Sequence, residues 1–337
     1  MFDHQQSDTL FMRRALELAT LGHGQVSPNP MVGCVVVHQN CIIGEGWHQK
    51  YGQPHAEVNA INDAIAAGFA HLLPQSTVYV TLEPCSHFGK TPPCADMLVQ
   101  KQVRKVVICN LDPNPLVAGR GIKKLQQADI EVVEGVLNQD GKQLNARFFA
   151  FFEKKRPYVI LKWAQTADGF IAAPDGTPLV ISNALSRTFS HKWRSEEDAI
   201  MVGTNTAQND NPKLNVRLWT GRNPVRVVVD AHQRLPNDLH LFDGTQPTRT
   251  YHTADLCHIL NDLYEQKIQS VLVEGGAKLL QSFINEGLFD EIRVFKSLQR
   301  VGNGIAAPIL KNGVLLTTQQ NLMDDALCYY FNPSEKP

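Results

Sequence analysis

The fold is decided by Pro54-His55-Ala56-Glu57, taken together with Thr81-Leu82-Glu83-Pro84-Cys85 and Pro92-Pro93-Cys94. A histidine and two thiolates are a typical ligand set for zinc, and they leave the fourth tetrahedral position open for water. Bound zinc lowers the pKa of water towards about 7, so a nucleophile becomes available near neutral pH. Glu57 follows the histidine by two positions, where it is placed to take a proton from that water. These stretches predict a hydrolytic zinc site.

The same order of residues is typical of zinc nucleobase deaminases, whose mark is H-x-E followed by P-C-x-x-C. The chain matches the first half, but eight residues separate Cys85 from Cys94 where that pattern has two. Two other interpretations stay open: a helix histidine with two unrelated core thiols, and a structural zinc site, which is normally closed by four protein ligands. We predict that His55, Cys85 and Cys94 hold one zinc ion per chain and that Glu57 is catalytic.

Outward from these stretches, strands and helices alternate along the chain. Strands are expected over residues 32–37, 42–47, 77–82, 105–109 and 130–133, and helices over 7–21, 57–67, from 94 onward, and 121–127. This alternation predicts a layered α/β domain. One phenylalanine-rich helix is expected over 138–152, followed by the charged stretch Glu153-Lys154-Lys155-Arg156-Pro157, which ends in a helix breaker. We therefore predict one domain over 1–150 and a second α/β domain over 156–337.

Composition limits the classes of partner. The chain has 337 residues, 43% of them hydrophobic, and its 32 basic and 33 acidic residues give a formal net charge of -1. A phosphate-tracking protein carries a marked basic excess, so no nucleic-acid partner is expected. The apolar stretch near the N-terminus is far shorter than the roughly 20 residues of a membrane span. Seven scattered cysteines are unlike a disulfide framework. We expect a cytoplasmic protein without a membrane partner, in which Cys34, Cys41 and Cys109 are core thiols.

The C-terminal half contains no G-x-G-x-x-G after a strand, so a Rossmann domain is not expected. It offers three weaker signals instead, Lys162–Gly169, Thr204–Arg217 and Val271–Ala277. The last reads as a strand, two glycines and a helix start, whose backbone N–H groups can cradle a pyrophosphate. Each has a plain structural alternative, since a Gly-Gly turn, an Asp-Gly hairpin turn or a solvated arginine needs no ligand.

Over nearly its whole length the chain resembles the family of bifunctional riboflavin-biosynthesis deaminase/reductases. The resemblance rests on the Cys85–Cys94 insert, Pro28-Asn29-Pro30, Gly44–His48, Asp112–Pro115, Gly119–Gly121 and the three C-terminal stretches. It implies a cytidine-deaminase-like three-layer α/β domain followed by a dihydrofolate-reductase-like domain. It also implies zinc-dependent deamination of a 2,5-diamino-6-ribosylamino-pyrimidinone 5′-phosphate, then NADPH-dependent reduction of its ribosyl group to ribityl.

Residue by residue, the family's motifs imply further roles. In the deaminase half, the substrate pocket is lined by Asn29, His48 and His87. In the reductase half, the cofactor contacts are Ala164, Thr206, Asp210, Gly276, Ala277, Lys278, Leu279, Leu280, Gln281 and Ser282. The substrate contacts there are Lys162, Arg194, Leu214, Arg217 and Glu274. Guanidinium groups bind phosphate well, so the two arginines are the expected phosphate ligands.

One stretch departs from the family. Pro178 and Val180 stand where relatives carry a serine and a tryptophan, so a hydroxyl contact and an aromatic wall are missing from the reductase. Two other functions also stay open: a deaminase of cytidine or of an adenosine in tRNA, with a degenerate C-terminal domain, and a zinc-stabilised interaction protein without activity. The favoured interpretation expects a small phosphorylated pyrimidine as substrate and a homo-oligomeric enzyme.

Overall fold

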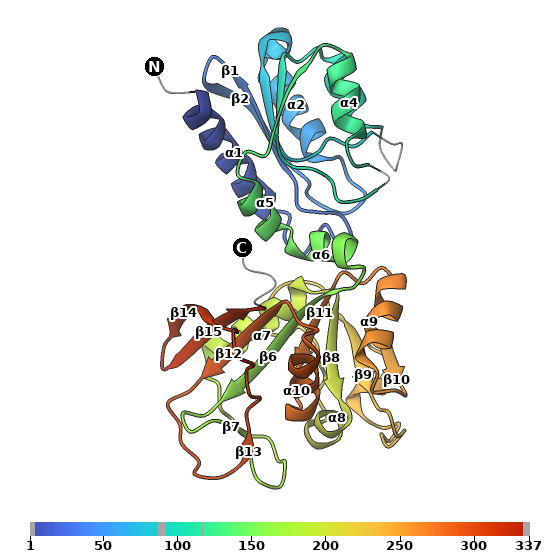
Figure 1. Ribbon diagram of the computed structural model, residues 1–337, viewed down its shortest axis with the longest axis vertical. Coiled ribbons are helices and arrows are strands. Elements are labelled where there is room, and N and C mark those ends of the chain that lie inside the picture. Colours follow the sequence, from blue (N-terminus) through green and yellow to red (C-terminus); the bar gives the residue numbers. More distant parts are fainter. Residues whose placement is uncertain (1–3, 87–91, 116, 333–337) are drawn as a thin grey trace. The chain divides into compact units, whose positions relative to one another are not determined.

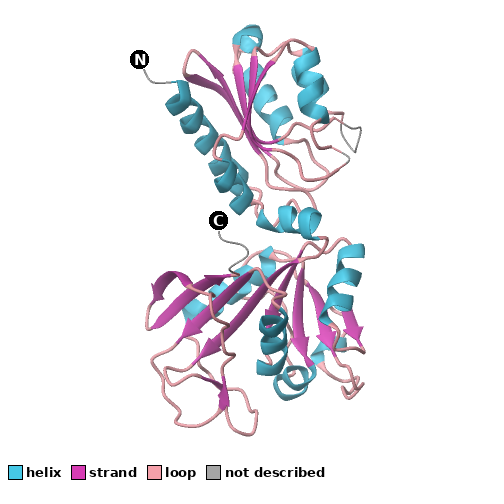
Figure 2. Ribbon diagram, viewed as in Figure 1, coloured by secondary structure: helices cyan, strands magenta, loops and turns pink. Residues whose placement is uncertain are grey.

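The computed structural model describes residues 4–86, 92–115 and 117–332 (Figure 1). By their internal contacts the residues divide into two compact units, Met1–Lys154 and Lys155–Pro337. Both units contain helices and strands, as Figure 2 shows. Among the described residues, no helix is long and apolar enough to cross a membrane.

The first unit is built on a five-stranded sheet with the strand order β2-β1-β3-β4-β5. β1 pairs antiparallel with β2 and β3, whereas β3, β4 and β5 run parallel to one another. The strands are β1 (Gly33–His38), β2 (Cys41–Trp47), β3 (Thr77–Leu82), β4 (Lys105–Asn110) and β5 (Glu131–Glu134). All six residues of β3 are buried, as expected of a central strand covered on both faces.

Helices cover both faces of this sheet. One face packs on α1 (His4–Thr20) and α5 (Asn138–Leu144), and the other on α2 (Ala56–Ala66), α3 (Cys94–Gln100) and α4 (Arg120–Gln127). A 3₁₀ turn, Ala70–Gln75, follows α2. The approach of α2 to β2 requires glycine, because a Cβ at Gly46 would lie 2.4 Å from the backbone nitrogen of Ala60. The three-layer α/β architecture is therefore confirmed.

The prediction of a single helix over 138–152 is wrong. The structure divides it at Asn145 into α5 and α6 (Ala146–Lys154). The side chain of Asn145 pairs with the backbone of Met31, accepting from its N–H at 2.8 Å and donating to its carbonyl at 2.8 Å. Beyond that break, Phe148 and Phe149 pack with Leu82 of the first unit's own sheet.

The second unit contains an eight-stranded sheet of order β10-β9-β8-β11-β6-β12-β15-β14. The strands from β10 to β12 are parallel, and β15 and β14 continue the sheet antiparallel. They are β6 (Tyr158–Gln165), β8 (Ala199–Gly203), β9 (Val225–Val229), β10 (Thr248–Tyr251), β11 (Ser270–Glu274), β12 (Glu291–Lys296), β14 (Leu316–Leu322) and β15 (Asp325–Phe331). A separate small pair joins β7 (Phe170–Ala172) and β13 (Ile305–Ala306).

The helices of this unit are α7 (Ala184–Glu196), α8 (Thr204–Asp210), α9 (Leu256–Glu265) and α10 (Ala277–Glu286), with a 3₁₀ turn at His240–Phe242. α9 and α10 share the larger hydrophobic core with the sheet, while α8 packs in a smaller core with β8 and β9. β8 and β11 are parallel neighbours, so α8 and α10, which follow them directly, begin at the same edge of the sheet (Figure 1).

Candidate active sites

The three expected zinc ligands come together in the first unit. His55 is the N-cap of α2, Cys85 follows β3, and Cys94 is the first residue of α3. The Nδ1 atom of His55 lies 3.6 Å from the sulfur of Cys85 and 3.4 Å from that of Cys94. Zinc with a Zn–N distance of about 2.1 Å, a Zn–S distance of about 2.3 Å and a tetrahedral angle would place these atoms roughly 3.6 Å apart. The donor set and its spacing therefore fit zinc.

The local electrostatics also favour a metal with an open position. All three ligand atoms lie within 4.8 Å of one another, and in the part of the chain that the structure describes no fourth His, Cys, Asp or Glu joins them. Hydrogen bonds from Cys94 and from His55 lower the pKa of Cys85, whose sulfur accepts the backbone N–H of Cys94 at 3.3 Å. The same contact with Cys85, together with burial, raises the pKa of the Cys94 thiol.

Glu57 lies in the first turn of α2, directly beside this cluster. Its side chain is buried, and its carboxylate hydrogen-bonds Cys94. Burial raises the pKa of Glu57 to about 7, with the negative charge of Cys85 adding to the effect. A carboxyl group with a pKa near neutrality can both accept and return a proton, which is the property that a general acid/base needs.

Glu83, for which the sequence predicted no role, attaches the end of β3 to the start of α4. Its buried carboxylate accepts the backbone N–H groups of Gly119 at 2.9 Å and Gly121 at 3.0 Å, at the start of α4. α4 in turn lies against Pro84, since a Cβ at Gly121 would be 2.0 Å from the Pro84 carbonyl oxygen. In the sequence, the position of Glu83 directly before Pro84-Cys85 is the one feature that pointed to this role.

Two of the three expected pocket residues lie together beside the zinc ligands. The Nδ1 atom of His48 donates to the carbonyl of Pro54, one residue before His55, at 3.1 Å. Its Nε2 atom is then left to accept from the side-chain amide of Asn29 at 3.1 Å. Burial lowers the pKa of His48, so the neutral ring is favoured. His87, the third, lies outside the described residues.

Two of the cofactor residues expected in the second unit, Thr206 and Gly276, come together where β11 ends. Gly275 and Gly276 have φ angles of 91° and 72°, which favour glycine. A Cβ on either would lie 3.2 Å from the side chain of Thr206 in α8, so the two glycines and Thr206 form one narrow turn. Gly276 is the N-cap of α10, whose first turn contains no acidic residue. Backbone N–H groups at such a helix start can bind a pyrophosphate, so this turn fits NADPH.

The remaining cofactor candidates differ in accessibility. Lys278 and Asp210 are exposed, whereas Ala164, Ala277, Leu279 and Ser282 are half-buried. The side chain of Leu280 is fully buried in the larger core. Gln281 pairs with the backbone of Ile309, donating to its carbonyl at 3.2 Å and accepting from its N–H at 2.8 Å. These two side chains therefore serve packing and loop attachment.

A charged cluster lies beside the same turn. Glu274, the last residue of β11, accepts two hydrogen bonds from Arg194, at 2.8 and 2.7 Å, and lies 3.8 Å from the ammonium of Lys162. Burial alone would raise the pKa of Glu274, but Arg194 and Lys162 outweigh it and hold the value at about 2. Burial lowers the pKa of Lys162, with Glu274 opposing the shift. The cluster thus places two cations around one carboxylate.

The other two substrate candidates lie on the loop from Asn211 to Arg217. Leu214 is buried in the smaller core, and Arg217 is exposed. This loop is attached to α7 twice, because Arg194 donates to the carbonyl of Asn215 at 3.3 Å and His191 accepts the backbone N–H of Arg217 at 3.3 Å. Burial, reinforced by the nearby arginines, lowers the pKa of His191 to about 4, so the ring stays a neutral acceptor.

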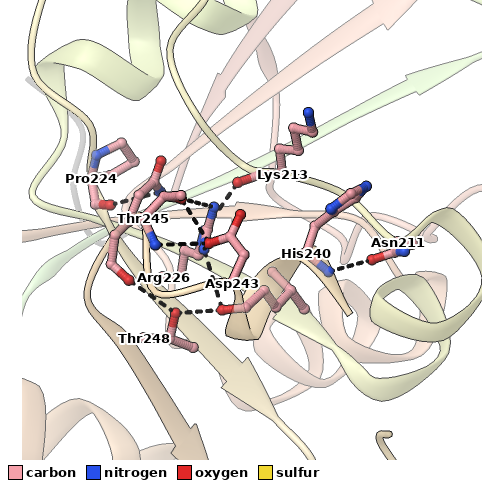
Figure 3. Close-up of polar contacts among 10 residues, drawn as sticks. Asn211, Lys213, Pro224, Arg226, His240, Asp243, Thr245 and Thr248 are labelled. Carbon is pink, nitrogen blue, oxygen red and sulfur yellow. Dashed lines mark hydrogen bonds and ion pairs between the residues drawn. The ribbon is translucent and has the colours of Figure 1, made fainter. Parts of the chain in front are cut away.

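A buried arginine attaches the start of this loop to the next one (Figure 3). Arg226, on β9, donates to the carbonyl of Lys213 at 3.0 Å and to that of Leu241 at 3.3 Å. Its guanidinium also pairs with Asp243 at 2.8 Å. The sequence offered no sign of this role, since Arg226 lies within a strand of valines.

Replacing Arg226 by methionine is expected to lower the reductase kcat/KM about 10- to 100-fold and to leave deamination within about twofold of wild type. The change removes the donor of the Lys213 carbonyl, at about 1–3 kcal/mol for an unsatisfied carbonyl, and so releases the start of the substrate loop. The Leu241 carbonyl keeps Thr248 as a donor, and Asp243 keeps Thr245. Steady-state assays of both activities measure it. Thr248→Val is the matched control, because it removes a hydrogen bond to Leu241 at 2.7 Å and leaves Lys213 untouched. Equal losses in the two variants would contradict the role of Arg226.

One expectation about a single residue changes. Cys41 is exposed, so the expectation of a core thiol there is wrong, whereas Cys34 and Cys109 are buried as expected. Cys41 opens β2 just after a turn, which leaves it at the surface. Val180, at the departure from the family's pattern, is 79% exposed, and Pro178 forms a single β-bridge with Ala172.

Comparison with known proteins supports both halves of this description. Residues 5–110 match the family described as the cytidine and deoxycytidylate deaminase zinc-binding region, and residues 157–323 match the RibD C-terminal domain. The riboflavin biosynthesis protein RibD of Aquifex aeolicus is 38% identical over 325 residues, which cover 90% of each chain. The RibD of Bacillus amyloliquefaciens is 40% identical over 330 residues, covering 90% of this chain and 87% of the relative.

Solved structures of similar proteins match both units of this chain. A Thermotoga maritima protein described as a diaminohydroxyphosphoribosylaminopyrimidine deaminase/5-amino-6-(5-phosphoribosylamino)uracil reductase superposes with a TM-score of 0.89 at 36% identity, over 98% of this chain and all of that one. The RibD of Acinetobacter baumannii gives a TM-score of 0.88 at 34% identity, over 97% of this chain and 99% of that one.

The folds and sites define a zinc-dependent cytidine-deaminase-like domain followed by an NADPH-dependent reductase domain of the dihydrofolate-reductase type. The chain belongs to the RibD family, and it is a bifunctional deaminase and reductase of riboflavin biosynthesis. The predicted fold class, enzyme class and cofactors are thereby confirmed. A degenerate C-terminal domain and an inactive scaffold are not supported, because the reductase half matches its family over nearly its full length.

Proposed function

We propose that the enzyme converts a 2,5-diamino-6-ribosylamino-pyrimidinone 5′-phosphate in two steps. In the first, water adds at C2 of the pyrimidine and ammonia leaves. In the second, hydride adds to C1′ of the ribosyl group while a proton goes to the ring oxygen, which opens the sugar to ribityl. The observation that carries this proposal is the pair of sites: a His-Cys-Cys cluster with a buried carboxyl group in one unit, and a glycine turn beside a Lys-Arg-Glu cluster in the other.

In the deaminase site, His55, Cys85 and Cys94 would hold the zinc ion, which when bound supplies the Lewis acidity that makes water nucleophilic near neutral pH. Glu57 moves the proton from the nucleophile to the leaving amine. Its buried position beside Cys94 excludes bulk water from that proton transfer. Asn29, His48 and His87 contact the pyrimidine. The hydrogen bond from Nδ1 of His48 to Pro54 fixes the tautomer, so Nε2 stays a hydrogen-bond acceptor in the pocket.

In the reductase site, NADPH when bound supplies the hydride. Thr206, Asp210, Ala164 and the start of α10 from Gly276 to Ser282 orient it, and within this segment Leu280 and Gln281 contribute by packing and loop attachment. The substrate contacts are Lys162, Arg194, Leu214, Arg217 and Glu274. Arg217 is the proposed phosphate ligand, since within the described part of the chain its exposed guanidinium has one hydrogen bond, to Asn215 at 3.2 Å, whereas Arg194 is occupied by Glu274 and the backbone.

We further propose that residues 1–150 and 156–337 are the two catalytic domains and that the enzyme is a cytoplasmic homo-oligomer without nucleic-acid or membrane partners. The charge balance and the lack of a membrane-spanning helix in the described chain support the last two points.

A coupled assay on the diaminopyrimidine phosphate tests the function. Without NADPH, each substrate molecule should release one ammonia and no nucleotide should be consumed. With NADPH, one nucleotide should be oxidised per ammonia released. Ammonia release from cytidine or RNA, with none from the pyrimidine phosphate, would instead support the cytidine or tRNA type of deaminase.

A further inference from the structure

The turn that follows β9, from Asp230 to Leu235, is held rigidly against α8. The buried carboxylate of Asp230 accepts the backbone N–H groups of Arg234 at 3.2 Å and Leu235 at 3.1 Å. It also accepts the hydroxyl of Thr204, the first residue of α8, at 3.1 Å. His252, which directly follows β10, donates its Nδ1–H to the Asp230 carbonyl at 3.1 Å. The position of Arg234 is therefore fixed before any ligand binds.

This turn lies at the edge of the sheet where the dinucleotide is proposed to bind. β11, β8 and β9 are parallel neighbours, so their exits lie side by side, as the arrowheads of β8 and β9 near α8 show in Figure 1. Strands are about 4.8 Å apart, which puts the exits of β11 and β9 roughly 10 Å apart. Arg234 reaches from this turn to α8, which follows the strand between them, because its guanidinium donates to the side chain of Asn205 at 3.4 Å. The next residue, Thr206, is the one that lies against Gly275 and Gly276.

The direction of the dinucleotide follows from what lies on each side of the Gly275-Gly276 turn. On the β6 side is the cluster of Lys162, Glu274 and Arg194, where the substrate and therefore the nicotinamide end belong. The adenosine end must then extend towards β8 and β9. The adenosine ribose begins a few bonds beyond the pyrophosphate, so its 2′-substituent falls within reach of the turn after β9.

Arg234 has the charge that this substituent requires. Its side chain is exposed, and among the residues that the structure describes it has no carboxylate partner. The nearest acid along the turn, Asp230, is buried and engaged by three donors. An exposed guanidinium without an anion is suited to bidentate binding of a phosphate.

We propose that Arg234 binds the 2′-phosphate of NADPH and thereby makes the reductase prefer NADPH to NADH. The two nucleotides differ only in this phosphate, so the residue that binds it sets the choice between them. The inference rests on the proposed cofactor site at the start of α10.

The test is nucleotide binding to the full-length protein, measured by the change in dihydronicotinamide fluorescence during titration. Arg234→Gln should raise the Kd for NADPH about 10- to 100-fold, the effect of losing charge-assisted hydrogen bonds to one phosphate, and change the Kd for NADH less than twofold. Adenosine 2′,5′-bisphosphate should lose affinity equally in calorimetry, whereas AMP should not. Lys267→Gln is the matched control, because it removes an exposed charge just before β11, at the opposite edge of the sheet, and should change neither nucleotide's affinity.

Unchanged NADPH binding in Arg234→Gln, or equal weakening of NADPH and NADH, would overturn the inference. A second variant separates this failure from failure of the proposed site. Lys278→Glu puts a negative charge into the first turn of α10 and should weaken both nucleotides alike. If Lys278→Glu weakens both and Arg234→Gln weakens neither, the site is correct and only the role of Arg234 is wrong. If neither variant has an effect, the dinucleotide binds elsewhere.

Discussion

Glu57→Gln is expected to lower deaminase turnover about 10²–10⁴-fold, the range for removing a positioned acid/base, with zinc content and reductase activity unchanged. Glutamine has nearly the same shape and can still fill the buried position in the first turn of α2, so the fold and the ligand cluster should survive. It cannot accept or return a proton. Ammonia release under saturating substrate measures the loss, and NADPH oxidation with pre-deaminated substrate reports the other site.

The matched control is Asp63→Asn, the same chemical change farther along α2. The side chain of Asp63 accepts the backbone N–H of Glu45 at 2.9 Å, which asparagine can also do, so this variant should retain full activity. Near-wild-type ammonia release by Glu57→Gln would show that another group moves the proton. Loss of both activities in Glu57→Gln would mean that the two reactions share one site.

Cys94→Ala is expected to reduce the zinc content from about one ion per chain to nearly none and to abolish deamination. The metal site has three ligands among the described residues, so removing one leaves too few to retain the ion. Reduction of pre-deaminated substrate should continue at the wild-type rate, because the reductase residues lie in the other compact unit. Elemental analysis of the purified protein and the two assays measure these outcomes.

Cys41→Ala provides the comparison for Cys94→Ala, since it removes an exposed thiol that is not among the clustered ligands. Its zinc content and both activities should equal those of wild type. Zinc retained at one ion per chain in Cys94→Ala would refute the ligand assignment, whatever happened to the activity.

The elements and residues that could be predicted from sequence are those with short-range signals. His55 and Glu57 are two residues apart at one helix start, and Cys85 and Cys94 each follow a proline. Their roles as metal ligands and acid/base can therefore be predicted from neighbouring residues, without knowledge of the fold. The strands β3 and β4 were predictable for the same reason, because each is a short run of buried, mostly apolar residues bounded by turn residues.

The supporting residues could not be predicted, because their roles depend on partners far along the chain. Asn145 breaks a helix whose local pattern is continuous, since its amide satisfies a backbone 114 residues away. Arg226 replaces a core residue in an apolar strand because two loops supply acceptors for its guanidinium. Such pairings give no periodic signal in a single sequence.

The pairing of Asn145 with Met31 also limits how this protein can be divided. Met31 is two residues from Asn29, so the deaminase pocket is held in shape by a segment that lies beyond the last strand of its own sheet. A stand-alone deaminase that ended soon after β5 would leave a buried peptide group unsatisfied and would uncover Leu82, on which Phe148 and Phe149 pack. Gene fission or domain grafting in this family would therefore have to transfer α5 and α6 with the deaminase, although both helices look like a linker.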